Sequence, residues 1–313
     1  MHTQRLVSTR LCLLGLVASL LAGCASLPPE APGQLRTEQL YVLTQDMVLI
    51  RINASQPSRE LSRQPLAGLP AGDALVGIDY RVARGILYGL SRAGRVFTIA
   101  PESGQLTQVG PPAALPQLAG QRFGFDFNPA VDRMRIVSDQ GANLRMHPDT
   151  GAQIDGNAAQ EGVQADKNLH YADGDSQAGQ QPVILAAAYT YNARNDKITT
   201  LYTIDALRGT LAMQGSREGE QPFVSPDSGQ LRTVGSLGLP ALDVLGMQPG
   251  GVGYGALQAA SLDISDVKNT AFLAARQKLG ASQLYEVNLQ TGKASRLGRI
   301  AQGQPLAGLA IIP

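Results

Sequence analysis

Two aspartates, Asp79 and Asp126, each stand between apolar residues in two similar stretches, GIDY at 77–80 and GFDF at 124–127. Carboxylates brought together from neighbouring strands could hold Ca²⁺, a hard cation that prefers oxygen ligands. The alternative is that each carboxylate accepts hydrogen bonds from backbone amides or pairs with a nearby arginine. We favour this second interpretation and predict no cofactor, with Ca²⁺ as the alternative.

A second group of polar side chains, Asn128, Asn143 and Arg145, falls within residues 123–153. Amide and guanidinium groups collected there could line a face that binds a small ligand. The stretch NPAVD at 128–132 is also ordinary turn chemistry between two strands. We therefore treat these three residues, with Asp79 and Asp126, as candidates for ligand binding rather than for catalysis.

Residues suited to catalysis are sparse. The chain has 3 His and 2 Cys, and no two histidines have the i, i+4 spacing of a zinc site on a helix. The Gly-x-Ser-x-Gly elbow of many hydrolases is missing from the sequence. We predict no catalytic residues and no metal ligands.

The candidate residues lie in a repeated unit. Residues 76–110 divide into four short apolar runs separated by turn residues, a pattern typical of an antiparallel meander. Residues 123–153 repeat this pattern, and the turn PESG at 101–104 recurs as PDTG at 148–151 and PDSG at 226–229. A four-strand unit that recurs every few tens of residues indicates a β-propeller blade. Asp79 and Asp126 would then lie on first strands, nearest the central channel.

The two ends of the chain complement each other. Residues 40–66 resemble the second, third and fourth strands of a blade, and the stretch LAGLAI at 306–311 resembles the first strand at 75–80. An open ring would leave a sheet edge exposed, and pairing of the two ends removes that edge. We therefore expect the C-terminal strand to complete the N-terminal blade.

These units predict an all-β protein with a single propeller domain at residues 39–313 and about five blades of four-stranded antiparallel sheet. The blades are assigned to residues 40–66 with 305–313, 75–110, 122–155, 183–235 and about 242–300. The first strand of the fifth blade is placed at 254–258, and polar residues 156–182 read as an insertion. Six blades, if the insertion hides strands, an irregular β-sandwich and an open solenoid are the alternatives.

The stretch GFDFNPAVDRMRIVSDQGANLRMHPDTG at 124–151, with GIDYR, LYGLS, NLHYADGD and AAAYT, resembles the bacterial exported family known as "domain of unknown function 4394". The resemblance extends from about residue 40 to the end of the chain. It implies an exported, propeller-like domain. No activity is assigned to that family, so the resemblance implies no catalytic residues.

The N-terminus has the features of a bacterial lipoprotein. Two arginines precede an apolar run at 11–21, which is the pattern of a secretory signal at residues 1–23. The run ends in LAGC, so we predict lipidation of Cys24. Residues 24–38, rich in proline, are expected to be an extended tether. Alanine after Cys24 resembles the pattern for the outer membrane, facing the periplasm, if the organism is Gram-negative.

These features favour a lipid-anchored protein of the cell envelope that serves as a non-enzymatic binding or scaffold propeller. Its partners would be the membrane, through the lipid, and an envelope protein or small ligand. A net charge of +1 gives no sign of a nucleic-acid partner. The alternative is a propeller enzyme, such as a metal-dependent hydrolase that uses carboxylates facing the channel.

Overall fold

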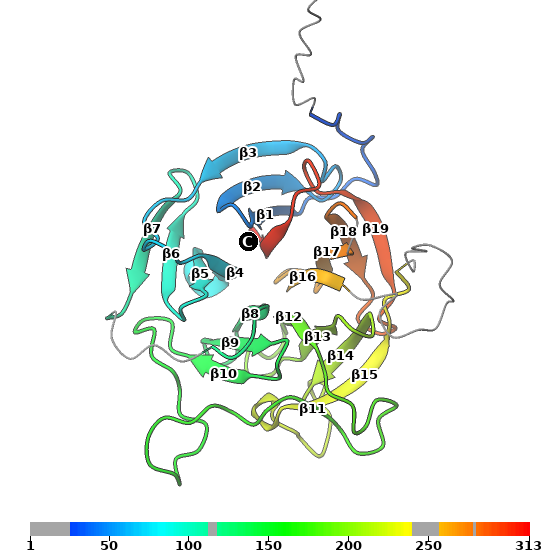
Figure 1. Ribbon diagram of the computed structural model, residues 1–313. Helices are drawn as coiled ribbons and strands as arrows, with labels where there is room; N and C mark the ends of the chain where they lie inside the picture. The colour runs from blue at the N-terminus through cyan, green and yellow to red at the C-terminus, as the bar shows by residue number, and fades with distance from the viewer. Residues whose placement is uncertain (1–25, 112–117, 240–256, 278–279) are drawn as a thin grey trace, which may run out of the picture.

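The computed structural model describes residues 26–111, 118–239, 257–277 and 280–313. Small antiparallel sheets are arranged in a ring around a central axis (Figure 1). Two single-turn 3-10 helices, Val82–Arg84 and Pro226–Ser228, are the only helices in the described part of the chain. No helix among those residues is long and apolar enough to cross a membrane.

Five sheets form the five blades of a β-propeller, so the predicted all-β propeller is confirmed. The innermost strands of successive blades are β20 (Leu306–Ile311), β4 (Leu75–Arg81), β8 (Phe123–Asn128), β12 (Ile184–Tyr189) and β16 (Leu257–Ile264). Outside β20 lie β1 (Gln39–Thr44), β2 (Val48–Asn53) and β3 (Glu60–Pro65), and outside β4 lie β5 (Ile86–Ser91), β6 (Val96–Ala100) and β7 (Gln105–Val109). Outside β8 lie β9 (Arg133–Ser138) and β10 (Asn143–Met146), and outside β12 lie β13 (Leu201–Asp205), β14 (Thr210–Gln214), β15 (Gln230–Ser236) and β11 (His170–Tyr171). Outside β16 lie β17 (Ala271–Gln277), β18 (Gln283–Val287) and β19 (Ala294–Arg299).

The ends of the chain close the ring as predicted. Strand β20 pairs antiparallel with β1, with Leu40 opposite Ile311 and Val42 opposite Leu309. The sheet order β20-β1-β2-β3 makes the C-terminal strand the innermost strand of the first blade. This pairing gives the C-terminal apolar residues both a hydrogen-bonded neighbour and cover.

The third and fourth blades differ from the prediction of regular four-stranded units, and the fifth differs in the position of its first strand. The third blade has three strands, and the fourth has five because β11 pairs in parallel with the outer strand β15. Strand β11 belongs to the insertion at 156–182, so that insertion enlarges an existing blade instead of forming a sixth. In the fifth blade the first described strand is Leu257–Ile264, which continues well beyond the predicted end at residue 258. Residues 254–256 of the predicted strand lie outside the described residues.

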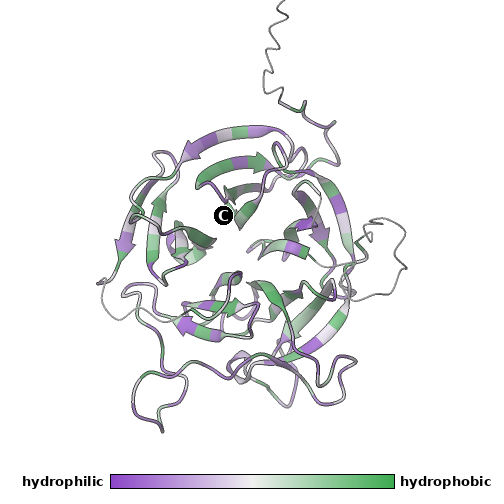
Figure 2. Cartoon of the chain, viewed as in Figure 1, coloured by the Kyte–Doolittle hydropathy of each residue, from purple (hydrophilic) through white to green (hydrophobic). Residues whose placement is uncertain are grey.

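The hydrophobic core lies between the blades. Its five clusters of buried side chains each join two adjacent blades; the cluster with Leu40, Ile50, Phe272 and Leu309, for example, joins the first and fifth. Figure 2 shows mostly hydrophobic inner strands and hydrophilic stretches on the outer strands β3, β15 and β19. Burial between blades, rather than within any one sheet, therefore holds the ring together.

Small residues let the innermost strands approach closely. A Cβ on Gly77 would lie 2.7 Å from the Cβ of Phe125, and one on Gly124 would lie 2.6 Å from the backbone N of Ala187. A Cβ on Gly308 would lie 2.8 Å from Cγ1 of Ile78. Each of these glycines faces the next blade in the ring, so a side chain there would push two blades apart.

Residues 26–38, which we call the N-terminal strap, lie against the outside of the seam between the first and fifth blades (Figure 1). The amide of Gly33 donates to the carbonyl of Ser55 in the first blade at 2.7 Å. The Glu30 carboxylate accepts from Nη2 of Arg296 at 2.7 Å and from the amide of Arg299 at 2.9 Å in the fifth. The part of the expected tether that the structure describes is thus bound to the propeller.

Removal of Leu306–Pro313 should leave the chain largely unfolded or aggregated, because β1 and the neighbouring blades lose their innermost partner. A milder variant, Gly308→Val, should lower the free energy of unfolding by about 1–3 kcal/mol through overpacking against Ile78. Thermal unfolding followed by circular dichroism measures both effects.

The matched control is Gly33→Val in the strap, where an added Cβ would meet only the Ser55 carbonyl at 3.5 Å. A truncated protein that stays soluble with an unchanged melting temperature would show that β20 is peripheral.

Candidate functional site

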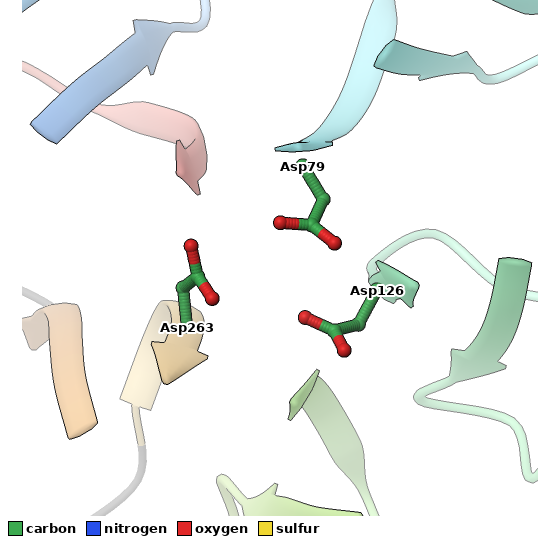
Figure 3. Close-up of side chains that lie close together, drawn as sticks. All are labelled: Asp79, Asp126 and Asp263. Carbon is green, nitrogen blue, oxygen red and sulfur yellow. The ribbon is translucent and has the colours of Figure 1, made fainter. Parts of the chain in front are cut away.

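Three buried aspartates converge at the centre of the ring. Asp79 on β4, Asp126 on β8 and Asp263 on β16 point toward one another (Figure 3). One carboxylate oxygen from each lies within 4.8 Å of those from the other two. The structure therefore brings the two aspartates singled out from the sequence together and adds a third.

Each carboxylate connects its own blade to the next one. Oδ2 of Asp79 accepts from the amide of Phe127 at 2.8 Å, and Oδ2 of Asp126 accepts from the amide of Tyr189 at 2.9 Å. Oδ2 of Asp263 accepts from the amide of Ile311 at 2.6 Å. We call these three contacts the carboxylate latches, because each one fastens an innermost strand to its neighbour in the ring.

Burial makes the ionised forms of the latch residues costly. Loss of solvation raises the pKa of Asp79 and of Asp126 well above the usual range. The negative charge of Asp263 raises the pKa of both further, and that of Asp79 also raises the pKa of Asp126. Burial likewise raises the pKa of Asp263 to about 7, although the amides of Ile311 and Ile264 favour its charged form. Protons shared among the carboxyls therefore stabilise the cluster.

None of the arginines in the described part of the chain pairs with a latch residue. Arg81 pairs with Asp132 and Asp149, and Arg135 pairs with Asp166 and Asp227. Of the two sequence-based interpretations, the geometry matches carboxylates that serve backbone donors. The three carboxylates are also the oxygen ligands that Ca²⁺ would require, so the alternative stays a prediction.

Asp263 was missed because the first strand of the fifth blade was placed too early. The stretch LDI at 262–264 carries the same apolar-Asp-apolar pattern as IDY at 78–80 and FDF at 125–127. This apolar-Asp-apolar triplet could have identified Asp263 from the sequence alone.

The candidates Asn143 and Arg145 belong to a separate group of charges around Arg135. The Arg135 side chain is 2% exposed, and its Nη1 donates to Oδ1 of Asn143 at 2.8 Å and to Oδ2 of Asp166 at 2.6 Å. Nε of Arg145 donates to the same oxygen of Asp166 at 2.9 Å. Asp227 completes the group by pairing with both arginines. Because the two arginines and the two aspartates neutralise one another, Arg135 is buried without an unpaired charge.

A pocket of about 540 Å³ opens beside this group, between the third and fourth blades. One wall comes from the third blade and includes Asn128, Arg133 and Arg145; the other comes from the fourth and includes Glu218 and Phe223. Asn128 also makes the turn contact expected of it, since its Oδ1 accepts from the amide of Ala130 at 2.9 Å.

An exposed aromatic ring marks the rim of the pocket. Five of the 6 phenylalanines are buried, whereas Phe223 is 66% exposed. Val131, on the same rim, is 57% exposed. Apolar side chains left in water beside a concave surface are typical of a ligand site.

The sequence-based candidates thus divide between two places. Asp79 and Asp126 form latches at the centre of the ring. Asn128 and Arg145 line the pocket, and Asn143 accepts a hydrogen bond from Arg135, which also lines it. Cys24 and the predicted signal at 1–23 lie outside the described residues. Asp227 belongs to the repeated turn PDSG, but that turn does not reveal its pairing with Arg135, and Asp166 belongs to no repeated motif.

The fold and these buried carboxylates define a five-bladed propeller whose innermost strands are joined around a closed centre. The family model described as "Domain of unknown function (DUF4394)" matches residues 48–310. The chain belongs to this family, which confirms the resemblance seen in the sequence. A search of curated proteins finds no match.

Several solved structures are similar in outline. A chain of a nidogen/laminin complex has a TM-score of 0.46 at 9% identity, covering 88% of this chain and 98% of that chain. A protein of unknown function from Bacteroides thetaiotaomicron VPI-5482 has a TM-score of 0.41 at 12% identity, covering 82% and 55%. The computationally designed Ika4 protein has 0.30 at 13%, covering 72% and 97%. At these scores the likenesses carry no argument about function.

The latch residues make stability depend on pH. They bind protons more tightly in the folded chain than in the unfolded chain, where the pKa of Asp is about 3.9. Their contribution is therefore complete below about pH 4 and is lost as the pH rises through the folded pKa, about 7 for Asp263. We expect the melting temperature to fall between about pH 5.5 and about pH 8.5, and Asp263→Asn to make that fall shallower.

The control is Asp173→Asn, an exposed aspartate in the insertion, which should keep the wild-type slope. The pKa of Asp73 and of Asp175 is lowered in the folded chain, so these residues change the pH dependence of stability only in more acidic solutions. An Asp263→Asn protein with the same slope as wild type would show that this carboxyl does not hold a proton in the folded chain.

Proposed function

We propose that this protein is a lipid-anchored propeller of the cell envelope that binds a small ligand without transforming it. The pocket between the third and fourth blades carries this proposal. Its volume of about 540 Å³ falls within the range typical of small-molecule sites, about 300–1,000 Å³. The exposed ring of Phe223 and the buried, hydrogen-bonded Arg135 supply the apolar surface and the fixed polar groups that such sites combine.

The N-terminal strap supports anchoring at a short distance. The amide of Leu27 donates to Oε1 of Gln302 at 2.8 Å, only three residues after Cys24. Three extended residues span about 10 Å. A lipid on Cys24 would therefore hold the edge formed by the first and fifth blades near the bilayer. The third and fourth blades, whose residues line the pocket, lie on the opposite side of the ring (Figure 1). We expect the outer membrane, facing the periplasm, if the organism is Gram-negative.

The alternative of a metal-dependent hydrolase has less support. Each latch carboxylate accepts an amide of the next blade, and the three residues are 3–7% exposed. A catalytic metal needs a coordination position open to substrate. Carboxylates used in this way are better suited to holding the ring than to presenting a metal.

Anchoring is tested by Cys24→Ser, which removes the thiol that would carry the lipid. We expect the wild type to take up labelled fatty acid and to fractionate with membranes, and the variant to do neither. The variant should keep the wild-type melting temperature, since it changes no described contact. A variant that still fractionates with membranes, beside a wild type without label, would contradict the lipid anchor.

Ligand binding is tested by thermal shift with a panel of amino acids, short peptides, sugars, nucleotides and carboxylic acids. We expect at least one class to raise the melting temperature of the wild type, and Phe223→Ser to abolish that rise. Val267→Ser is the control, because Val267 is also an exposed apolar residue but does not line the pocket. A shift that persists in Phe223→Ser would place the ligand elsewhere.

A further inference from the structure

Most charges around the pocket between the third and fourth blades neutralise one another. Arg135 and Arg145 pair with Asp166 and Asp227. Glu220 pairs with Arg232. These groups are already satisfied by the protein, so they shape the pocket without demanding charge from a ligand.

Two charged side chains that line the pocket lack a partner of opposite charge among the described residues. The guanidinium of Arg133 donates from Nη1 only to the backbone carbonyls of Val131 and Asp132, at 3.3 and 2.8 Å. The carboxylate of Glu218 accepts only from the hydroxyl of Thr190, at 3.4 Å. One positive and one negative group are thus left for something else to pair with.

These two groups lie on opposite walls. Arg133 begins β9 in the third blade, and Glu218 lies in the loop between β14 and β15 of the fourth. They form no ion pair with each other, since no oxygen of Glu218 lies within the 4.0 Å of a salt bridge to Arg133. A ligand that meets both groups needs an anionic end and a cationic end.

Part of the pocket lining is apolar. Val131, Ile154, Ile198 and Phe223 form this part together. Apolar ligand side chains would cover this surface and remove Phe223 from water.

We propose that the pocket binds a short peptide with free termini and apolar side chains, its carboxylate on Arg133 and its ammonium on Glu218. This inference rests on the proposed ligand-binding function and names the ligand class. Charge-assisted hydrogen bonds to both termini would fix the length and direction of the peptide, and the apolar wall would select its side chains.

The test is isothermal titration calorimetry on the full-length protein in detergent, with the dipeptide Leu-Leu as the probe. We expect binding that weakens about tenfold or more when the N-terminus is acetylated or the C-terminus is amidated. Arg133→Gln should remove the difference between Leu-Leu and its amide, and Glu218→Gln the difference between Leu-Leu and its acetyl form. Arg194→Gln, an exposed arginine in the neighbouring loop, should bind as the wild type does.

Equal affinity for the free and both capped peptides would overturn the assignment of the two termini. If that affinity were still lost in Phe223→Ser, the pocket would remain a ligand site and the proposed function would stand. Absence of heat with all three peptides, together with a thermal shift by another ligand class that Phe223→Ser abolishes, would overturn the peptide inference alone. Absence of any pocket-dependent shift would overturn both.

Discussion

The constraint on which the structure depends is the close contact between neighbouring innermost strands. Each of these strands carries a small residue, and in three of them it is a glycine whose added Cβ would meet the neighbouring strand. Two positions later stands either an aspartate or an alanine. Three of the five seams have a carboxylate latch. The paired positions, in ring order from β20, are Gly308 and Ala310, Gly77 and Asp79, Gly124 and Asp126, Ala186 and Ala188, and Ser261 and Asp263.

The latches explain why buried acids are tolerated at the centre. An unpaired buried carboxylate is costly, but each of these oxygens receives an amide that would otherwise lack a partner at the end of an innermost strand. Protonation removes the repulsion that remains. Where alanine replaces aspartate, at Ala188 and Ala310, other contacts join the blades; between the fourth and fifth blades, for example, the Asn269 side chain exchanges hydrogen bonds with the backbone of Tyr191.

A firmly joined centre leaves the outer strands free to vary. The third blade stops after three strands, and the fourth accepts β11 from a long insertion without disturbing β12. The pocket arises between these two irregular blades, and the strap binds the seam on the other side of the ring. Differences among the outer strands therefore form the pocket and the site of the strap, while the innermost strands maintain the ring.

The sequence was sufficient for features that repeat locally. The meander at 76–110, its copy at 123–153 and the terminal strand at 306–311 predicted five blades and their closure, because each unit carries its own turns and apolar runs. Features that depend on distant residues were not predictable. Arg135 finds Asp166 and Asp227 across 31 and 92 positions, and the two-residue strand β11 has no periodic pattern of its own. Asp263 could have been predicted from the apolar residues on either side of it, but the strand that carries it was placed too early in the sequence.

The central claim is that the three buried aspartates hold the ring together as protonated partners of backbone amides. Carboxyl ¹³C chemical shifts measured by NMR on protein labelled at aspartate, across a pH series with and without Ca²⁺, test it most directly. We expect the signals of Asp79, Asp126 and Asp263 to titrate well above the range of exposed aspartates and not to respond to Ca²⁺. Titration of all three near pH 4, or shifts on addition of Ca²⁺ that are lost in Asp126→Ala, would contradict it.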